Sequence, residues 1–293
     1  MSKIKTALIQ QSYHGSKINT IDKTVSMIEE ASSNGVQLVV LQELHQNEYF
    51  CQSENTDYFD YANNYLEDIK FWANIAKLNK IVLVTSLFEK RAAGLYHNTA
   101  FVFEKDGSIA GKYRKMHIPD DPGFYEKFYF TPGDIGFEPI STSVGKLGVL
   151  ICWDQWYPEA ARLICLKGAQ VLIYPTAIGW FDEDSKDEKQ RQIDSWITIQ
   201  RSHAIANGVP LISVNRVGFE KDNSNVLDGI RFWGNSFVCD AQGDITIQAN
   251  NIDESILYSE INYTNSENIR RIWPFLRDRR IENYSGLTKR FID

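Results

Sequence analysis

The stretch KLGVLICWDQWYPEAARL, residues Lys146–Leu163, changes character partway along its length. Its first part, KLGVLI, is apolar and rich in aliphatic residues, as buried strands are. Its last part begins with Pro158 and Glu159, residue types that are favoured in the first turn of a helix. Cys152 and the segment WDQW lie at the corner between the two parts. The pattern predicts a strand–turn–helix unit with a thiol at its turn.

The same alternation of strand and helix patterns extends over the rest of the chain. Further strand-like runs are TALIQ, VQLVVLQE, KIVLVTSLFE, AQVLIYPT and VPLISVNR. Amphipathic stretches typical of helices cover residues 18–34, 61–79, 158–167 and 189–207. Residues 101–111 and 237–247 have hairpin signals, with turn residues between two short strands. We therefore predict an α/β protein with mixed sheets, folded as one domain over residues 1–293.

Composition and charge exclude several classes of protein. Hydrophobic residues make up 43% of the 293 positions, which is enough for a large core and argues against disorder. The net charge of −7 disfavours nucleic acid and anionic membrane as partners, because both attract basic patches. The N-terminus has no secretory signal, and no apolar run reaches membrane-spanning length. We expect a cytoplasmic protein.

The cysteines do not form a recognisable pair. Cys51, Cys152, Cys165 and Cys239 lack the spacing of a zinc site or a disulfide framework. A thiol beside a helix N-terminus, as at Cys152, is expected to favour the thiolate. Most free cysteines in strands are small buried hydrophobes, and that is our interpretation of the other three.

A nucleophilic cysteine needs a base and an oxyanion stabiliser, and two charged residues are suitably placed. Glu43 ends the apolar run VQLVVLQE, and Lys115 follows the first hairpin in GKYRKMHI. Catalytic groups of open α/β sheets gather at strand ends. Each charge taken alone is more often an ordinary surface group or ion pair. The loop at 119–137, rich in aromatic residues, Gly and Pro, is long enough to indicate function.

Together these residues resemble the nitrilase, or carbon–nitrogen hydrolase, superfamily. Glu43 in LQE, Lys115 in YRKMH and Cys152 in ICWD match its triad in order, and Glu126 in GFYEKFYF matches a second glutamate. The resemblance runs from Ile4 to about residue 284. It implies a four-layer αββα sandwich that pairs into a homodimer or a higher homo-oligomer. The tail, about residues 265–293, is then a candidate subunit contact, although it could pack on its own subunit instead.

The resemblance also implies an activity. CWDQWYPEAAR, HIPDDPGFYEKFYFTPGD, YPTAIG and WPFLRDRRIENY are similar to segments of the members that hydrolyse N-carbamoylputrescine to putrescine, carbon dioxide and ammonia. In that reaction Cys152 is the nucleophile and Glu43 the base. Lys115 and the Trp153 amide stabilise the oxyanion, and Glu126 orients Lys115 or water. The scheme needs no metal and no organic cofactor.

The substrate contacts follow less directly from the sequence. Trp153 and Trp156 are expected to wall a slot for an alkyl chain, although core packing is an alternative. Asp182, Glu183 and Asp184 are candidates to meet the substrate ammonium, although such a run is commonly a solvated loop. Another N-carbamoyl amine, an N-carbamoyl amino acid or an aliphatic amide stays open as the substrate. A non-catalytic interaction module and a redox-sensing thiol are the alternatives from other functional classes.

Overall fold

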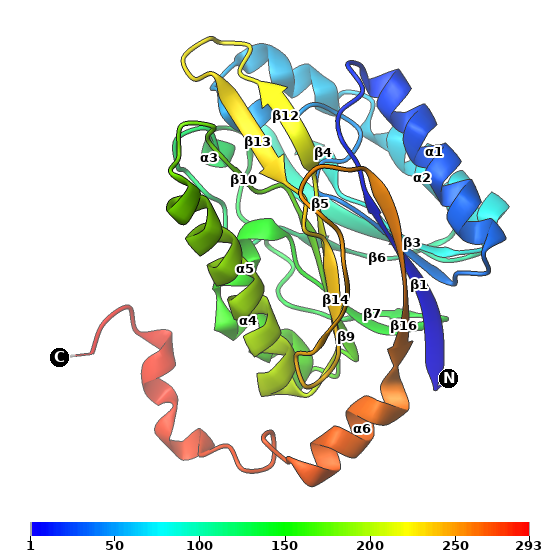
Figure 1. Ribbon diagram of the computed structural model, residues 1–293, viewed down its shortest axis with the longest axis vertical. Coiled ribbons are helices and arrows are strands. Elements are labelled where there is room, and N and C mark those ends of the chain that lie inside the picture. The colour runs from blue at the N-terminus through cyan, green and yellow to red at the C-terminus, as the bar shows by residue number, and fades with distance from the viewer. Residues whose placement is uncertain (1, 293) are drawn as a thin grey trace.

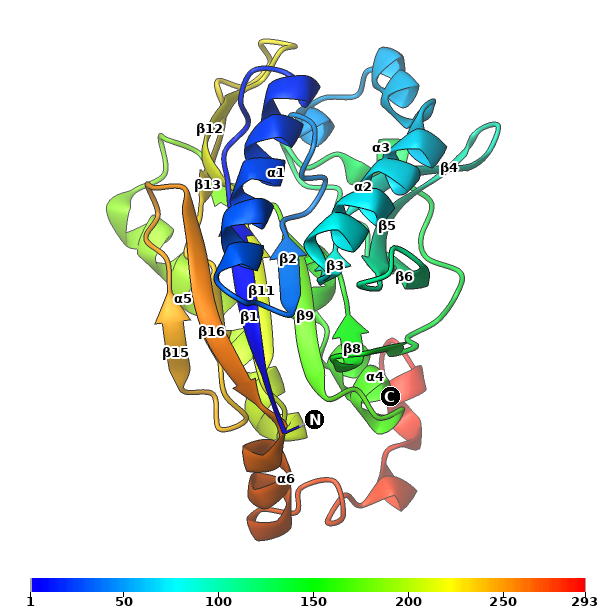
Figure 2. The ribbon, with the colours of Figure 1, turned by 90° about the vertical axis from the view of Figure 1, so that its right-hand side faces the viewer.

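The computed structural model describes residues 2–292, which form two β-sheets packed face to face with helices on both outer faces (Figures 1 and 2). Figure 1 shows the order of the layers from α1 and α2, through the two sheets, to α4 and α5, and Figure 2 views the molecule from the side of α1 and α2. The predicted αββα sandwich with mixed sheets is confirmed.

The first sheet has seven strands in the order β16-β1-β2-β3-β5-β4, with β6 paired to β5. The strands are β1 (Lys3–Gln10), β2 (Leu38–Leu41), β3 (Val82–Val84), β4 (Leu87–Ala92), β5 (Leu95–Phe103), β6 (Ile109–Arg114) and β16 (Ser255–Asn262). β1, β2 and β3 are parallel, and the remaining pairs are antiparallel. The predicted hairpin at 101–111 is the β5–β6 connection.

The second sheet has six strands in the order β15-β14-β11-β9-β8-β7. They are β7 (Ile140–Thr142), β8 (Gly145–Val149), β9 (Val171–Thr176), β11 (Leu211–Asn215), β14 (Phe237–Cys239) and β15 (Ile245–Gln248). β8, β9 and β11 are parallel at its centre. A small three-stranded sheet joins β10 (Gly179–Trp180), β13 (Gly229–Trp233) and β12 (Val217–Lys221).

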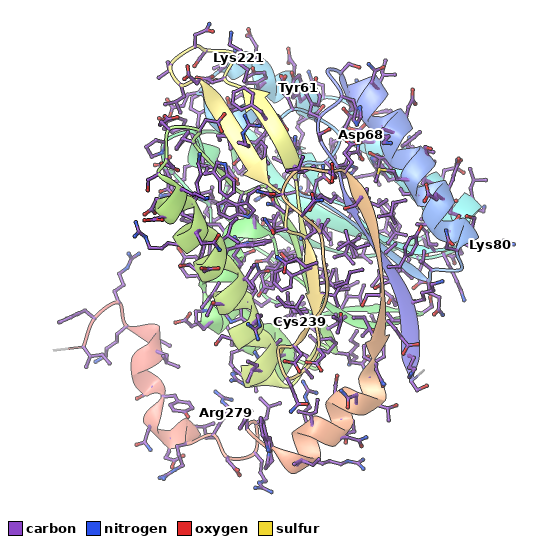
Figure 3. All side chains as sticks on the ribbon, in the orientation of Figure 1. Tyr61, Asp68, Lys80, Lys221, Cys239 and Arg279 are labelled. Carbon is purple, nitrogen blue, oxygen red and sulfur yellow. The ribbon has the colours of Figure 1, made fainter. Side chains whose placement is uncertain are left out.

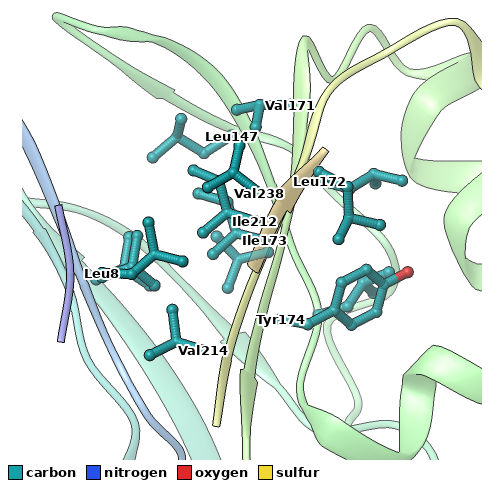
Figure 4. Close-up of a cluster of buried hydrophobic side chains, with 14 of the residues drawn as sticks. Leu8, Leu147, Val171, Leu172, Ile173, Tyr174, Ile212, Val214 and Val238 are labelled. Atoms are coloured by element: carbon teal, nitrogen blue, oxygen red, sulfur yellow. The ribbon is translucent and has the colours of Figure 1, made fainter. Parts of the chain in front are cut away.

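Alternation of side chains along the strands divides the core into two layers. In β1, Ile4 and Leu8 belong to the cluster between the sheets, whereas Ala7 and Ile9 belong to the cluster beneath the helices. Figure 4 shows Leu8 facing Ile212 and other aliphatic side chains of the second sheet. Burying a strand on both faces explains why these runs are apolar throughout.

The helices cover the outer faces of both sheets. The helices α1 (Lys17–Ser33) and α2 (Tyr65–Asn79) lie on the first sheet, and α4 (Pro158–Leu166) and α5 (Lys186–Asn207) lie on the second (Figure 1). The Ser16 and Ser185 hydroxyls cap α1 and α5 by accepting bonds from the amides of Asn19 and Glu188. The predicted helix at 61–79 starts later, because residues Thr56–Ala62 form a 3-10 helix.

The end of the chain leaves the sandwich. After α6 (Tyr263–Ile272), it runs as an arm around one end of the molecule through short turns at Ile281–Asn283 and Ser285–Thr288 (Figure 1). Several of its large apolar side chains are exposed, including Trp273 and Phe291. Its part in subunit contacts stays a prediction. Among residues 2–292, no helix has the length and apolar character needed to cross a membrane.

The end of α2 supplies a stability test. Lys80 is exposed at the surface (Figure 3) and has a left-handed backbone with φ of 54°. A side chain is strained in that region and glycine is not. We expect Lys80→Gly to stabilise the fold by about 1 kcal/mol, which differential scanning calorimetry would detect as a raised Tm. Lys77→Gly, within the last turn of the same helix, should lower Tm. A lower Tm for Lys80→Gly would contradict this account of the cap.

Candidate active site

Three strand ends bring the predicted triad together. Glu43 follows β2 by two residues, Lys115 follows β6 directly, and Cys152 follows β8 by three residues. The first two side chains are fully buried, and Cys152 is 3% exposed. Residues from both sheets therefore meet in one buried cluster.

The Lys115 ammonium lies between two carboxylates. Its Nζ donates to Glu43 Oε1 at 2.7 Å and to Glu126 Oε2 at 2.6 Å. Asn98 Nδ2 also donates to Glu43 Oε1, at 2.7 Å, and the Tyr49 hydroxyl donates to Glu126 Oε1, at 2.8 Å. Glu43 Oε2 has no hydrogen-bond partner among the described residues. This oxygen is available to accept a proton.

Burial and charge set the protonation states of this cluster. Burial alone would lower the pKa of Lys115, but the Glu126 and Glu43 carboxylates outweigh it and raise that pKa. Lys115 therefore keeps its positive charge at neutral pH. Burial raises the pKa of Glu126 to about 7, against the opposing effect of Lys115. Near neutral pH, Glu126 can thus exchange a proton.

Cys152 occupies a sharp turn. It begins a 3-10 helix, Cys152–Trp156, and its φ of 41° is left-handed, which is unusual for a side-chain-bearing residue and is found mainly at functional sites. The thiol lies 3.7 Å from the Ala177 carbonyl oxygen. Burial and the Glu43 carboxylate raise the pKa of the thiol, with Lys115 opposing them. The expectation that helix amides would favour the thiolate is therefore wrong for the resting site, and a base is needed to remove the proton.

Asp154 fixes the geometry of this turn. Its Oδ2 accepts hydrogen bonds from the Ile151 amide and the Tyr113 hydroxyl, both at 2.9 Å. Its Oδ1 accepts from the His117 amide at 3.0 Å and lies 2.7 Å from His117 Nδ1. Tyr113 and His117 flank Lys115 in the chain. Asp154 thus ties the nucleophile turn to the segment that carries the lysine.

A cavity of about 570 Å³ lies beside Cys152. Its aromatic walls are Phe124, Trp153, Trp156, Trp180, Phe181 and Trp233. Its charged side chains are Asp121, Glu126, Asp184, Glu188 and Arg191. The loop at 119–137, for which we predicted a function, supplies Asp121, Phe124 and Glu126. The cavity suits an extended apolar chain with polar or charged ends.

The predicted substrate contacts divide into two groups. Trp153, Trp156 and Asp184 line the cavity. Asp182 and Glu183 are exposed and lie outside its lining. The Asp182 carboxylate instead accepts two hydrogen bonds of 2.6 Å from Arg231, which hold its side chain outside the cavity lining.

Several site residues escaped the sequence analysis. Glu188 was assigned to no element, because the helix was predicted to start at residue 189, whereas α5 starts at Lys186 and aims its first turn at the cavity. Asn98 had a weak signal, since it is a polar residue next to the apolar run Ala100–Phe103 of strand β5. Tyr49 lies in a loop, and no sequence pattern indicated that it belongs to the site. Among residues 2–292, no cluster of His, Cys, Asp and Glu side chains is arranged to hold a metal ion.

Comparison with known proteins agrees with this geometry. The sequence pattern of the carbon-nitrogen hydrolase family matches residues 5–271. A citrullinase from Francisella tularensis is 38% identical over 99% of this chain and 100% of its own length. An N-carbamoylputrescine amidase from Oryza sativa is 38% identical over 98% of this chain and 95% of its own length.

A solved structure is similar over the whole length. The crystal structure of a carbon-nitrogen hydrolase from Helicobacter pylori G27 has a TM-score of 0.97 and 59% identity, covering 99% of this chain and 100% of the other. The protein described here belongs to the carbon–nitrogen hydrolase family of the nitrilase superfamily.

Proposed function

We propose that the protein hydrolyses N-carbamoylputrescine to putrescine, carbon dioxide and ammonia. The observation that carries this proposal is the cavity beside Cys152, which combines aromatic walls with a surplus of acids. Apart from Glu126, which is bonded to Lys115, its charged groups are three carboxylates and one guanidinium. A substrate with an apolar four-carbon chain and a terminal ammonium matches both features.

The first half of the reaction forms a covalent intermediate. Glu43 removes the proton from the Cys152 thiol, and the sulfur attacks the ureido carbon. Lys115 and the Trp153 amide stabilise the negative charge that develops on the ureido oxygen. The bond from that carbon to the terminal nitrogen then breaks. The nitrogen leaves as ammonia, taking the proton from Glu43.

The second half releases the amine. Glu43 removes a proton from a water molecule, whose oxygen attacks the carbon of the thiocarbamate, and the carbon–sulfur bond breaks. Cys152 regains its proton from Glu43. The product is a carbamic acid, which decomposes to carbon dioxide and putrescine. Glu126, bonded to Lys115, keeps the ammonium aligned with the oxyanion through both halves.

A second candidate substrate is a ureido amino acid. Arg191 lines the cavity and would suit a carboxylate, and one relative is a citrullinase. However, Arg191 is already paired with Glu188, which lies three residues earlier in α5. The remaining acids, Asp121 and Asp184, favour a cationic end, and we therefore place the ureido amine first.

We also propose that the enzyme is a cytoplasmic homodimer or higher homo-oligomer in which the tail at 265–293 contacts another subunit. The exposed apolar side chains of the tail support this arrangement, because such residues are commonly covered in an assembly. Size-exclusion chromatography with light scattering, before and after removal of the tail, would test it.

The first prediction concerns the nucleophile. Cys152→Ala should abolish ammonia release from N-carbamoylputrescine, because no other group in the cluster can form the thiocarbamate. Cys165→Ala is the control, since Cys165 is buried in α4 outside the cavity lining. It should keep most of the activity. Ammonia release by Cys152→Ala at the wild-type rate would refute the mechanism.

The second prediction separates the two glutamates. Glu43→Gln should reduce kcat by roughly 10²–10⁴-fold, the contribution typical of a general base. In the wild type, kcat/KM should decrease as pH falls through about 7, because the pKa of Glu126 is raised to about 7 and its carboxylate is lost below that value. Glu126→Gln should lower kcat and remove this limb. An unchanged pH profile in Glu126→Gln would argue against the assignment.

The third prediction tests the charged end of the cavity. Asp184→Asn or Asp121→Asn should raise KM for N-carbamoylputrescine about tenfold or more, since both acids line the cavity and a hydrogen bond to a charged group is worth roughly 1.5–3 kcal/mol. Neither change should affect N-butylurea, which lacks the ammonium. Glu183→Gln, in the same loop but outside the cavity lining, is the matched control. Faster turnover of citrulline than of N-carbamoylputrescine, lost in Arg191→Met, would instead identify the ureido amino acid as the substrate.

A further inference from the structure

A second buried ion pair lies behind the triad. Arg216, between β11 and β12, is 1% exposed, and Glu220 in β12 is 7% exposed. Arg216 Nη1 donates to Glu220 Oε1 at 2.6 Å. Neither residue lines the cavity beside Cys152. The mechanism above uses neither of them, so their burial needs another explanation.

The guanidinium holds the loop that follows the base. Arg216 Nη2 donates to the Leu44 carbonyl at 2.9 Å and to the Glu43 carbonyl at 3.3 Å. Both terminal nitrogens donate to the Asn47 carbonyl at 3.0 Å. A planar group with several donors can hold three carbonyl groups at once, which a lysine ammonium does with less directional control.

This loop is held in a strained conformation. Leu44 has a left-handed φ of 46°, which is unfavourable for a residue with a side chain and persists only where neighbours enforce it. The Leu44 amide donates to the Ser86 hydroxyl at 3.1 Å, and the Leu44 carbonyl accepts from Arg216. Arg216 and Ser86 together fix the backbone from which the Glu43 side chain projects.

The same ion pair reaches the second carboxylate. Glu220 Oε2 accepts a hydrogen bond of 2.6 Å from the Tyr49 amide, and the Tyr49 hydroxyl donates to Glu126. A continuous series of contacts therefore runs from Arg216 through Glu220 and Tyr49 to Glu126. The Arg216 guanidinium is therefore connected by hydrogen bonds to both carboxylates that bind Lys115: to Glu43 through its backbone, and to Glu126 through Glu220 and Tyr49.

We infer that Arg216 is a positioning residue, held by Glu220, that aligns the Glu43 and Glu126 carboxylates on Lys115. Stability alone is a poor reason to keep such a pair, because a buried ion pair can often be replaced by apolar residues without loss. Alignment of the reacting groups is a better reason to keep the ion pair, because a shift of about 1 Å in a reacting group can cost roughly 10²-fold in rate. The inference rests on the roles proposed above for Glu43 and Lys115.

The decisive variant is Arg216→Met/Glu220→Gln. It leaves no unpaired buried charge, and the glutamine oxygen can still accept the Tyr49 amide bond. We expect kcat to fall about 10²-fold while KM stays within about threefold, because neither residue lines the cavity. The single variant Arg216→Lys, which keeps the positive charge, should lose less kcat than the double variant. Arg201→Met is the control, since Arg201 in α5 donates through Nε to the Gly243 carbonyl, in the turn between β14 and β15 and outside the site. It should leave kcat unchanged.

Two further measurements separate alignment from general weakening of the fold. Alkylation of Cys152 by iodoacetamide should slow in the double variant, because a displaced Glu43 removes the thiol proton less effectively. Tyr49→Phe, which tests the second branch without touching the ion pair, should move the acid limb of kcat/KM to higher pH. In the wild type, the hydrogen bond from Tyr49 favours the ionised form of Glu126 and lowers its pKa, so removal of this bond should raise the pKa of Glu126. Arg201→Met should change neither result.

The outcomes separate this inference from the proposed function. If the double variant folds with wild-type kcat and alkylation rate while Cys152→Ala is inactive, the inference is wrong and the mechanism stands. Equal losses in the double variant and in Arg201→Met also overturn it. If the double variant does not fold, Arg216→Lys and Tyr49→Phe carry the test through kcat and the pH profile. Should no ureido compound be a substrate, alkylation still reports the alignment of Glu43 with Cys152.

Discussion

The active site depends on one buried ammonium shared by two carboxylates. Lys115 is fully buried, and its desolvation is tolerable only because Glu43 and Glu126 both bind it. The same contacts fix where Glu43 points. They leave one of its oxygens without a partner beside a thiol whose pKa is raised. In the proposed mechanism, the thiol holds its proton in the resting site and the Glu43 carboxylate removes it when the sulfur attacks the substrate.

Both strained residues at the site are held by buried charges. Cys152, the proposed nucleophile, and Leu44, which follows the proposed base in the chain, have left-handed backbones. Asp154 holds the first by accepting the Ile151 amide, and Arg216 holds the second by donating to its carbonyl. The sandwich supplies the frame, because strands packed on both faces cannot move without disrupting the core. Rigid strand ends and charged clamps thus set the relative positions of the reacting groups.

The alternatives to an enzyme are less consistent with these contacts. A redox-sensing thiol would be accessible and acidic, whereas all four cysteines are buried and free. The pKa of Cys165 and that of Cys239 are each raised by burial to about 12, which makes both thiols unreactive. A non-catalytic module would have no reason to keep a buried lysine between two carboxylates, since such a cluster costs free energy without substrate chemistry to justify it.

The amino-acid sequence was sufficient to predict the fold class and to select Glu43, Lys115 and Cys152 as candidate reacting residues. Apolar runs alternating with amphipathic stretches predict an α/β protein with mixed sheets. The local motifs of Glu43, Lys115 and Cys152 resemble the family, and that resemblance implies the αββα sandwich. Only the tertiary structure decided which acid of the 182–184 run reaches the cavity and that Arg216 is buried. Local pattern records which face of an element is apolar. Arg216 contacts a loop some 170 positions earlier in the chain. These contacts form only when the two sheets pack face to face, and a local sequence pattern carries no information about contacts between such distant segments.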